Sequence, residues 1–355
     1  MIWILMFALM DDYGDYRVIK TFENLPEASG DFLTNPYTMH FSADQELYVA
    51  DRATGRIHVW NKDGKYERSF AGPGKGPGEL EAPIRLVVTD SRVWVWELSQ
   101  QISVFQRDGS FERSFKIPGI TPRAFAVLNP DLLLLLYRGA SGSGNDAHFI
   151  FKLVDGNGEE LSVLKDFTKE TLAPIEGDNR TIAKAFGPDG DIQRAPDGTW
   201  WFGFSESRKL YQIDAQGQVL GERLFELPTG KPNTEERDLV ANMSFPTPNG
   251  QRISLKNLPN MRISYDHDKA FYTHFLFHKD KAVFALTPIG GFNGLGNGFY
   301  HASFGVNEAA TGRALERGQY DFPEDSMVLY RDGHILAIVM EGQDIVLKEI
   351  LLKGM

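Results

Sequence analysis

Hydrophobic and polar residues alternate along much of this chain, in short runs separated by tight turns. Between residues 46 and 80, apolar residues recur at alternate positions within each of three runs. A period of two residues is typical of a β-strand with one buried face. Gly55 and the pair Asp63-Gly64 stand between the runs, and such residues reverse a chain at low steric cost. The pattern predicts three antiparallel strands, Leu47–Asp51, Arg56–Trp60 and Tyr66–Ala71.

The last two of these strands belong to an internal repeat. Arg56–Phe70 returns 45 residues later as Gln101–Phe115 without a gap, and eight of the 15 positions are identical. Displacements of 94 and 153 residues carry the turn glycine Gly64 to Gly158 and Gly217. A repeat of about 40–50 residues with four strands is typical of a β-propeller blade, which cannot bury both of its faces alone.

The strand pattern fills six such units. The sixth holds only three strands, Met327–Arg331, His334–Glu341 and Asp344–Leu352. Tyr16–Phe22 resembles the last strand of each repeat but has no partner strands before it. We therefore predict an all-β fold: one six-bladed β-propeller over residues 16–355, with four-stranded antiparallel blades and the N-terminal strand completing the C-terminal blade. Such closure removes exposed sheet edges.

Composition narrows the function classes. The 355 residues contain 48 acidic and 37 basic residues, a net charge of −11, and no basic run, which argues against a nucleic-acid partner. There is no cysteine, so disulfides and thiolate metal sites are excluded. The glycine-rich segments 72–80 and 290–298 lack the strand-to-helix context of phosphate and dinucleotide loops. We assign no catalytic residue, metal site or cofactor.

Residues 1–15 precede the predicted domain. Met1–Met10 is uncharged and apolar, but as a helix it would span only ~15 Å, about half of a bilayer core. Three interpretations stay open: the tail of a signal peptide, a segment that contacts a membrane or partner through Trp3 and Phe7, or a packed strand.

A family resemblance rests on Tyr48–Trp60 (YVADRATGRIHVW) and the linker Gly72–Pro83 (GPGKGPGELEAP). These segments resemble the NHL-type six-bladed β-propellers and related bacterial propellers, most specifically over residues 35–119. The resemblance implies a binding scaffold. A minority of related propellers, the lactonase-like ones, hydrolyse esters with a calcium ion at the ring axis, and this is the alternative function.

The inner strands suggest what lines the axis. They offer His40, Arg85, Arg123 and Arg331, which are basic or neutral. Cations repel a divalent metal ion, so this set disfavours a calcium site and favours an anionic ligand in the channel.

We place a partner surface on two loops, an insertion at Thr229–Met261 with a short helix at Thr234–Met243, and the segment 290–298 with Phe292 and Leu295. The expected function is a non-catalytic binding or scaffolding protein. We expect it on the periplasmic or cell-surface side as an extrinsic subunit of a membrane protein complex, with Met1–Met10 as a peripheral membrane contact.

Overall fold

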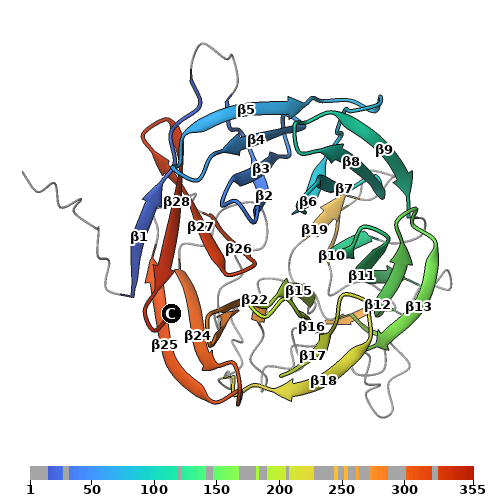
Figure 1. Cartoon of the computed structure of the whole chain (residues 1–355). Coiled ribbons are helices and arrows are strands. Elements are labelled where there is room, and N and C mark those ends of the chain that lie inside the picture. The colour runs from blue at the N-terminus through green and yellow to red at the C-terminus, as the bar shows by residue number, and fades with distance from the viewer. Residues whose placement is uncertain are drawn as a thin grey trace, which may run out of the picture.

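Six four-stranded antiparallel sheets stand around a central axis as the blades of a ring (Figure 1). Every regular element among the described residues of this computed structural model is a β-strand. The structure describes residues 15–26, 32–117, 121–140, 147–167, 181–183, 190–204, 208–227, 244–246, 252–254, 261–263, 272–286, 301–321 and 327–355. The predicted fold class is confirmed.

Each blade is named here from its innermost to its outermost strand. Blades one to three are β2 (Pro36–Phe41), β3 (Leu47–Asp51), β4 (Arg56–Trp60) and β5 (Tyr66–Ala71); β6 (Pro83–Val88), β7 (Arg92–Glu97), β8 (Gln101–Gln106) and β9 (Phe111–Lys116); and β10 (Thr121–Asn129), β11 (Leu132–Ala140), β12 (Ala147–Asp155) and β13 (Glu160–Asp166). Blades four to six are β15 (Gly190–Arg194), β16 (Trp200–Phe204), β17 (Lys209–Ile213) and β18 (Val219–Leu224); β22 (Tyr272–His278), β23 (Lys281–Leu286), β24 (His301–Glu308) and β25 (Ala314–Asp321); and β26 (Met327–Arg331), β27 (His334–Glu341), β28 (Asp344–Leu352) and β1 (Tyr16–Thr21).

The hydrophobic cores lie between blades, as expected for sheets that cannot shield both faces alone. Each of six buried clusters combines residues of two neighbouring blades. The leucine run of β11 illustrates the arrangement: Leu133 and Leu135 pack toward blade two, while Leu134 and Leu136 pack toward blade four. Alternate residues of one strand therefore serve two cores, which explains why the run contains no polar position.

The N-terminal strand closes the ring. β1 pairs antiparallel with β28, and Tyr16 lies opposite Leu352. Tyr16 is buried in the core between blades five and six, and Phe22 is buried in the core between blades six and one. The predicted closure by the N-terminal strand is confirmed.

Deleting residues 1–21 is expected to lower the melting temperature and to cause concentration-dependent association. The deletion removes β1, exposes the edge of β28 and uncovers the core between blades five and six, and open strand edges pair with other chains. Thermal unfolding and size-exclusion chromatography measure both effects. Deleting only residues 1–14 keeps β1 and serves as the control. Equal behaviour of the two deletions would contradict the closing role of β1.

In three blades, a basic side chain of the outermost strand donates a hydrogen bond to a backbone carbonyl in the turn between the two outer strands of the next blade. Lys20, Arg68 and Arg113 occupy the same register on the outermost strands of three blades. Their donors reach the carbonyls of Lys62 (2.9 Å), Arg107 (2.8 Å) and Gly156 (3.0 Å) in the next blade. The arginine shared by the sequence repeat is therefore an interblade contact.

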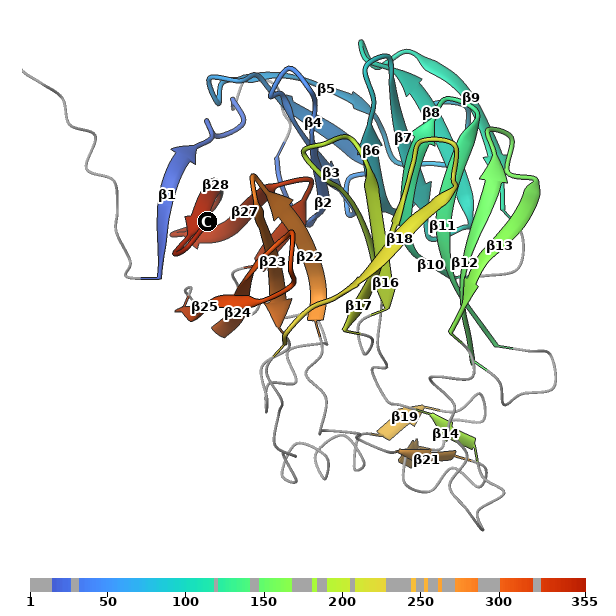
Figure 2. The same ribbon diagram turned by 60° about the horizontal axis from the view of Figure 1, so that its bottom comes forward.

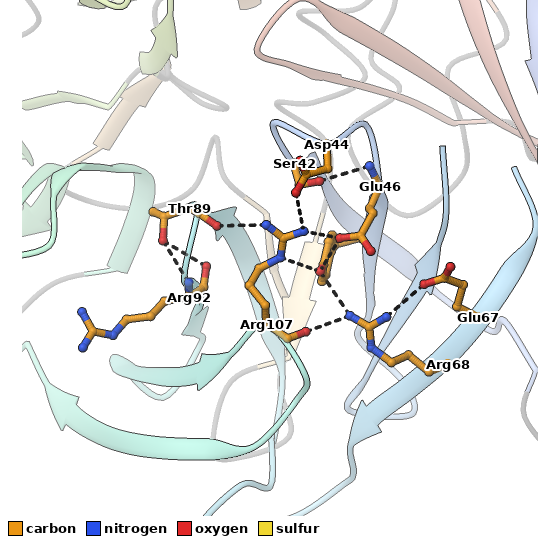
Figure 3. A network of polar contacts seen from close by, with 9 residues as sticks. Ser42, Asp44, Glu46, Glu67, Arg68, Thr89, Arg92 and Arg107 are labelled. Carbon is orange, nitrogen blue, oxygen red and sulfur yellow. Dashed lines mark hydrogen bonds and ion pairs between the residues drawn. The ribbon is translucent and has the colours of Figure 1, made fainter. Parts of the chain in front are cut away.

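A larger polar network reinforces the seam between blades one and two (Figure 3). Arg107, in the turn between β8 and β9, donates from Nε to the Tyr48 hydroxyl (2.9 Å) and from a terminal nitrogen to the Glu46 carboxylate. The Tyr48 hydroxyl donates in turn to Glu46 (3.0 Å) and accepts from Arg68 (3.3 Å). These contacts pair polar groups that are largely buried between the two blades, so the network is a structural element of the ring.

The two faces of the ring differ. Because the blades repeat around one axis, every inner strand begins at one face, here called the loop face, and ends at the other, the turn face. Four short strands belong to the connections before β15 and β22: β14 (Thr181–Ala183) pairs with β21 (Met261–Ile263), and β19 (Ser244–Pro246) pairs with β20 (Arg252–Ser254). β14, β19 and β21 lie outside the ring, beyond one face (Figure 2). The helix predicted at Thr234–Met243 lies outside the described residues.

Candidate functional site

A buried arginine crosses the ring axis. Arg331 is the last residue of β26 in blade six, and it is 8% exposed. Its two terminal nitrogens donate to the carbonyls of Ile192 (3.1 Å) and Phe125 (3.3 Å). These carbonyls belong to β15 and β10, the inner strands of blades four and three, and blade three lies opposite blade six in the ring. The guanidinium therefore links the inner strand of blade six to the inner strands of blades four and three, across the axis of the ring.

The next residue, Asp332, joins three blades. Its Oδ2 lies 2.8 Å from Nε2 of His40 in blade one and 3.5 Å from Nε of Arg331. Its Oδ1 accepts a hydrogen bond from the Arg194 backbone N–H (2.9 Å), and its own N–H donates to Gln193 Oε1 (2.8 Å). Four neighbours in blades one, four and six therefore fix one aspartate.

The turn that carries this aspartate is a two-residue hairpin. Asp332 and Gly333 have φ values of 42° and 88°. Two successive positive φ values are characteristic of the type I′ turn, which Asp-Gly adopts readily. The local sequence thus fixes the backbone of the turn, and the contacts with His40, Arg331 and Arg194 position the Asp332 carboxylate.

Hydrogen bonds continue from this turn along the axis. Gln193 donates from Nε2 to Asp191 Oδ2 (2.8 Å), and the backbone N–H of Phe275 donates to the same oxygen (3.2 Å). His274 places Nδ1 3.5 Å from that oxygen. We call His40, Asp191, Gln193, His274, Arg331 and Asp332 the axial network.

Burial and charge set the protonation of the turn. Burial lowers the pKa of the His40 imidazole below its ordinary value, and the contact with Asp332 offsets only part of this effect. Burial alone would raise the pKa of the Asp332 carboxyl, but Arg331 and His40 outweigh it and hold that pKa well below its usual range. At neutral pH the axis therefore contains a neutral imidazole, a carboxylate and a guanidinium.

The structure brings together two of the four predicted channel residues. His40 and Arg331 meet at Asp332, and both direct polar atoms to the protein itself. Arg85 donates from a terminal nitrogen to the adjacent Ile84 carbonyl (2.8 Å). Arg123 lies in β10, but its side chain is outside the described residues. The predicted partner contacts Trp3, Phe7, Phe292 and Leu295 also lie outside them.

Four members of the axial network were not predicted as channel residues from the sequence: Asp191, Gln193, His274 and Asp332. Asp191 and Gln193 belong to β15, the inner strand of blade four, to which the repeat pattern assigned no residues. Its sequence, GDIQR, contains one large apolar residue and no repeat signal. The Asp-Gly pair at 332–333 was a turn signal, but it did not indicate a buried carboxylate.

In the glycine-rich linker between blades one and two, a backbone N–H group binds the carboxylate of Glu79, which belongs to the same linker. The backbone N–H of Gly76 donates to Glu79 Oε2 (2.7 Å), and Leu80 N–H donates to the Gly72 carbonyl (2.8 Å). In phosphate-binding loops such backbone N–H groups face the anion. Here a carboxylate of the same loop takes that place, consistent with a structural connection.

The loop face presents two exposed apolar side chains. Phe32, before β2, is 63% exposed, and Leu98, in the turn after β7, is 49% exposed. The Leu98 backbone is held by a hydrogen bond from its N–H to the Ala82 carbonyl (2.9 Å). Large apolar residues on loops of a rigid scaffold are common anchors of interfaces.

Within the part of the chain that the structure describes, no helix is long and apolar enough to cross a membrane. Across the same residues, no group of three or more His, Asp or Glu side chains is arranged to hold a metal ion.

Comparisons with known proteins agree with the fold. The family model described as 6-bladed β-propeller (DUF5128) matches residues 27–83, and no curated protein matches the chain. A protein from Bacteroides fragilis described as exported shares 11% identity over 98% of each chain, with a TM-score of 0.61. A DUF4221 family member from Bacteroides vulgatus shares 11% identity over 96% of this chain and 99% of that chain, with a TM-score of 0.60.

Virginiamycin B lyase from Staphylococcus aureus shares 15% identity over 90% of this chain and 96% of that chain. Its TM-score of 0.41 is too low to support an argument about function. The chain is a six-bladed β-propeller, the fold that it has in common with the two Bacteroides proteins.

Proposed function

We propose that the protein is a non-catalytic binding or scaffolding propeller that holds a protein partner on its loop face. The difference between the two faces supports this proposal. The turn face is closed by short turns, interblade hydrogen bonds and the axial network. The loop face carries the exposed Phe32 and Leu98, and connections with strand pairs of their own enter the inner strands there. Long connections on a rigid scaffold are where binding functions concentrate.

The charge at the axis is the reason to prefer binding over calcium-dependent hydrolysis. In a lactonase-like propeller, carboxylates and amides from several inner strands would converge on a cation at the axis. In this protein the Arg331 guanidinium occupies the axis, and the carboxylate beside it, Asp332, already pairs with that guanidinium. A second cation there would meet repulsion from a buried charge.

We further infer a location outside the cytoplasm, as an extrinsic subunit of a membrane protein complex. The Bacteroides fragilis protein of similar fold is described as exported. The apolar Met1–Met10 segment offers a contact with a membrane or with the complex. Kinship with the NHL-type propellers, which the sequence resemblance suggests, fits a binding role but stays part of this proposal.

An anionic ligand in the channel would depend on Arg85 and Arg123, because His40 and Arg331 are engaged in the axial network. Sign reversal at both arginines should abolish ligand binding. Unchanged affinity in that double variant would end the channel hypothesis.

A pull-down from native membranes tests the proposed partner face. We expect a defined partner to co-purify with the wild-type protein and to be lost when Phe32 and Leu98 are both changed to aspartate. The matched control is Leu161→Asp with Val163→Asp on β13, because these side chains are similarly exposed on the outer rim (57% and 49%). Retention of the partner by Phe32→Asp/Leu98→Asp, or its loss in the rim control, would contradict the proposed surface.

Removing Met1–Met10 should release the protein from membranes.

A further inference from the structure

The turn between β26 and β27 holds the axis closed through a contact that depends on the charge of one histidine. His40 has a 6% exposed side chain, and its Nε2 lies 2.8 Å from Asp332 Oδ2. The same oxygen lies 3.5 Å from Nε of Arg331. One carboxylate oxygen of Asp332 thus lies between the His40 imidazole and the Arg331 guanidinium in a largely buried site.

We propose that the Arg331–Asp332 turn is an acid-released latch, and that protonation of His40 frees this turn from the axis and opens the channel at the turn face. With a neutral His40, the three side chains carry one positive and one negative charge. A proton on His40 adds a second cation without a second anion. An uncompensated charge in a desolvated site is costly, and the turn can lower that cost by moving toward water.

Other charged groups near His40 do not compensate for the added proton. β2 packs against β3, β6, β26 and β27. The titratable groups at these contacts are Tyr48 in β3, Arg85 in β6, Arg331 and the following Asp332 at the end of β26, and His334 in β27. Tyr48 lies opposite His40. His334 stacks on Phe41, and its Nδ1 lies 2.6 Å from the Glu349 carboxylate. His278 of β22 also approaches the turn, at 3.4 Å from the Gly333 carbonyl. Asp332 is the carboxylate in contact with His40, and Arg331 already shares it.

The sign of the pH dependence follows from burial. Burial lowers the pKa of His40 in the closed latch, whereas a solvated His40 has its ordinary pKa near 6.5. The open form therefore binds the proton more readily, and acid shifts the equilibrium toward it. Release begins as the pH falls below about 6.5. Asp332 stays ionised in this range, because its own pKa is held below the usual value.

Two backbone amides report directly on the latch. The Asp332 N–H donates to Gln193 Oε1, and the Arg194 N–H donates to Asp332 Oδ1. Both bonds join blade six to blade four across the axis, so release of the turn breaks both. The Gly109 amide, bonded to the Gln106 carbonyl within blade two (3.0 Å), is a reference that the latch does not touch.

Amide hydrogen exchange of the full chain tests the proposal. Between about pH 7.5 and about pH 5.5, on either side of the histidine range, protection of the Asp332 and Arg194 amides should fall by up to ~10-fold after correction for intrinsic exchange, which is the limit for one proton with a pKa near 6.5 in the open form. Protection of the Gly109 amide should stay constant. His40→Gln should remove the pH response at the two reporters, whereas His278→Gln should keep it. A response that survives His40→Gln, or is absent from the wild-type protein, overturns the latch.

A second measurement needs no variant. In the wild-type protein, the His40 ring resonances should titrate with a midpoint below about 6.5, and the Asp332 amide shift should follow the same curve. A His40 midpoint at or above that value, or an Asp332 amide that does not change with it, overturns the proposal even if His40→Gln fails to fold.

Discussion

Arg331→Met is expected to lower the free energy of unfolding by about 3–5 kcal/mol, the cost typical of removing one partner of a buried charge pair. The substitution leaves the Asp332 carboxylate near the axis without its cation, and it leaves the Ile192 and Phe125 carbonyls without their donor. Urea unfolding followed by tryptophan fluorescence measures the change.

Two further variants isolate this effect. Arg92→Met removes a partly exposed ion pair with Glu112 (2.7 Å; the side chains are 27% and 21% exposed) and should cost less, about 1 kcal/mol. Adding Asp332→Asn to Arg331→Met should recover part of the loss, because it neutralises the abandoned carboxylate. If Arg331→Met and Arg92→Met cost the same, Arg331 does not hold the axis closed.

Gly109→Ala is expected to destabilise the protein more than the same change at Gly342. Both glycines have a positive φ, 95° and 68°, so an alanine at either position meets backbone strain of about 1–2 kcal/mol. At Gly109 the new Cβ would also lie 2.7 Å from Cβ and Cγ of Phe70 in the neighbouring blade. The Phe70 backbone would have to move, at a further cost of about 1–3 kcal/mol.

Gly342 is the matched control, because a Cβ there has no neighbour within 4 Å. The difference between the two variants in urea unfolding therefore measures the close approach of blades one and two. Equal losses would show that the Asp-Gly turn needs glycine only for its backbone conformation and that the seam tolerates a larger side chain.

The sequence predicted the ring because its period is local and repeated. The Asp-Gly turns and the alternation within strands can each be recognised within the sequence of a single blade. The strand Tyr16–Phe22 is recognised because it has no partner strands before it. The leucine run of β11 was equally informative, because only a strand covered on both faces lacks polar positions.

The axial network could not be predicted in the same way. Arg331 binds a carbonyl 139 positions away, and that contact depends on how blades four and six face each other. β15 supplies two of the network residues but resembles no other inner strand, since it lacks the large apolar residues that mark β6 or β26. The exposed Phe32 and Leu98 of the loop face were also not predicted, because connections between blades carry no period.

Closure by β1 has a consequence for the order of synthesis. Tyr16 pairs with Leu352, which is made 336 residues later. At ~5–20 residues per second, β1 waits on the order of 17–67 seconds on the ribosome before its partner exists. The alternating apolar residues of β1 are free to bind a chaperone or another nascent chain during that interval. A translational delay at any point between β1 and β28 lengthens this interval and should therefore lower the yield of intact rings.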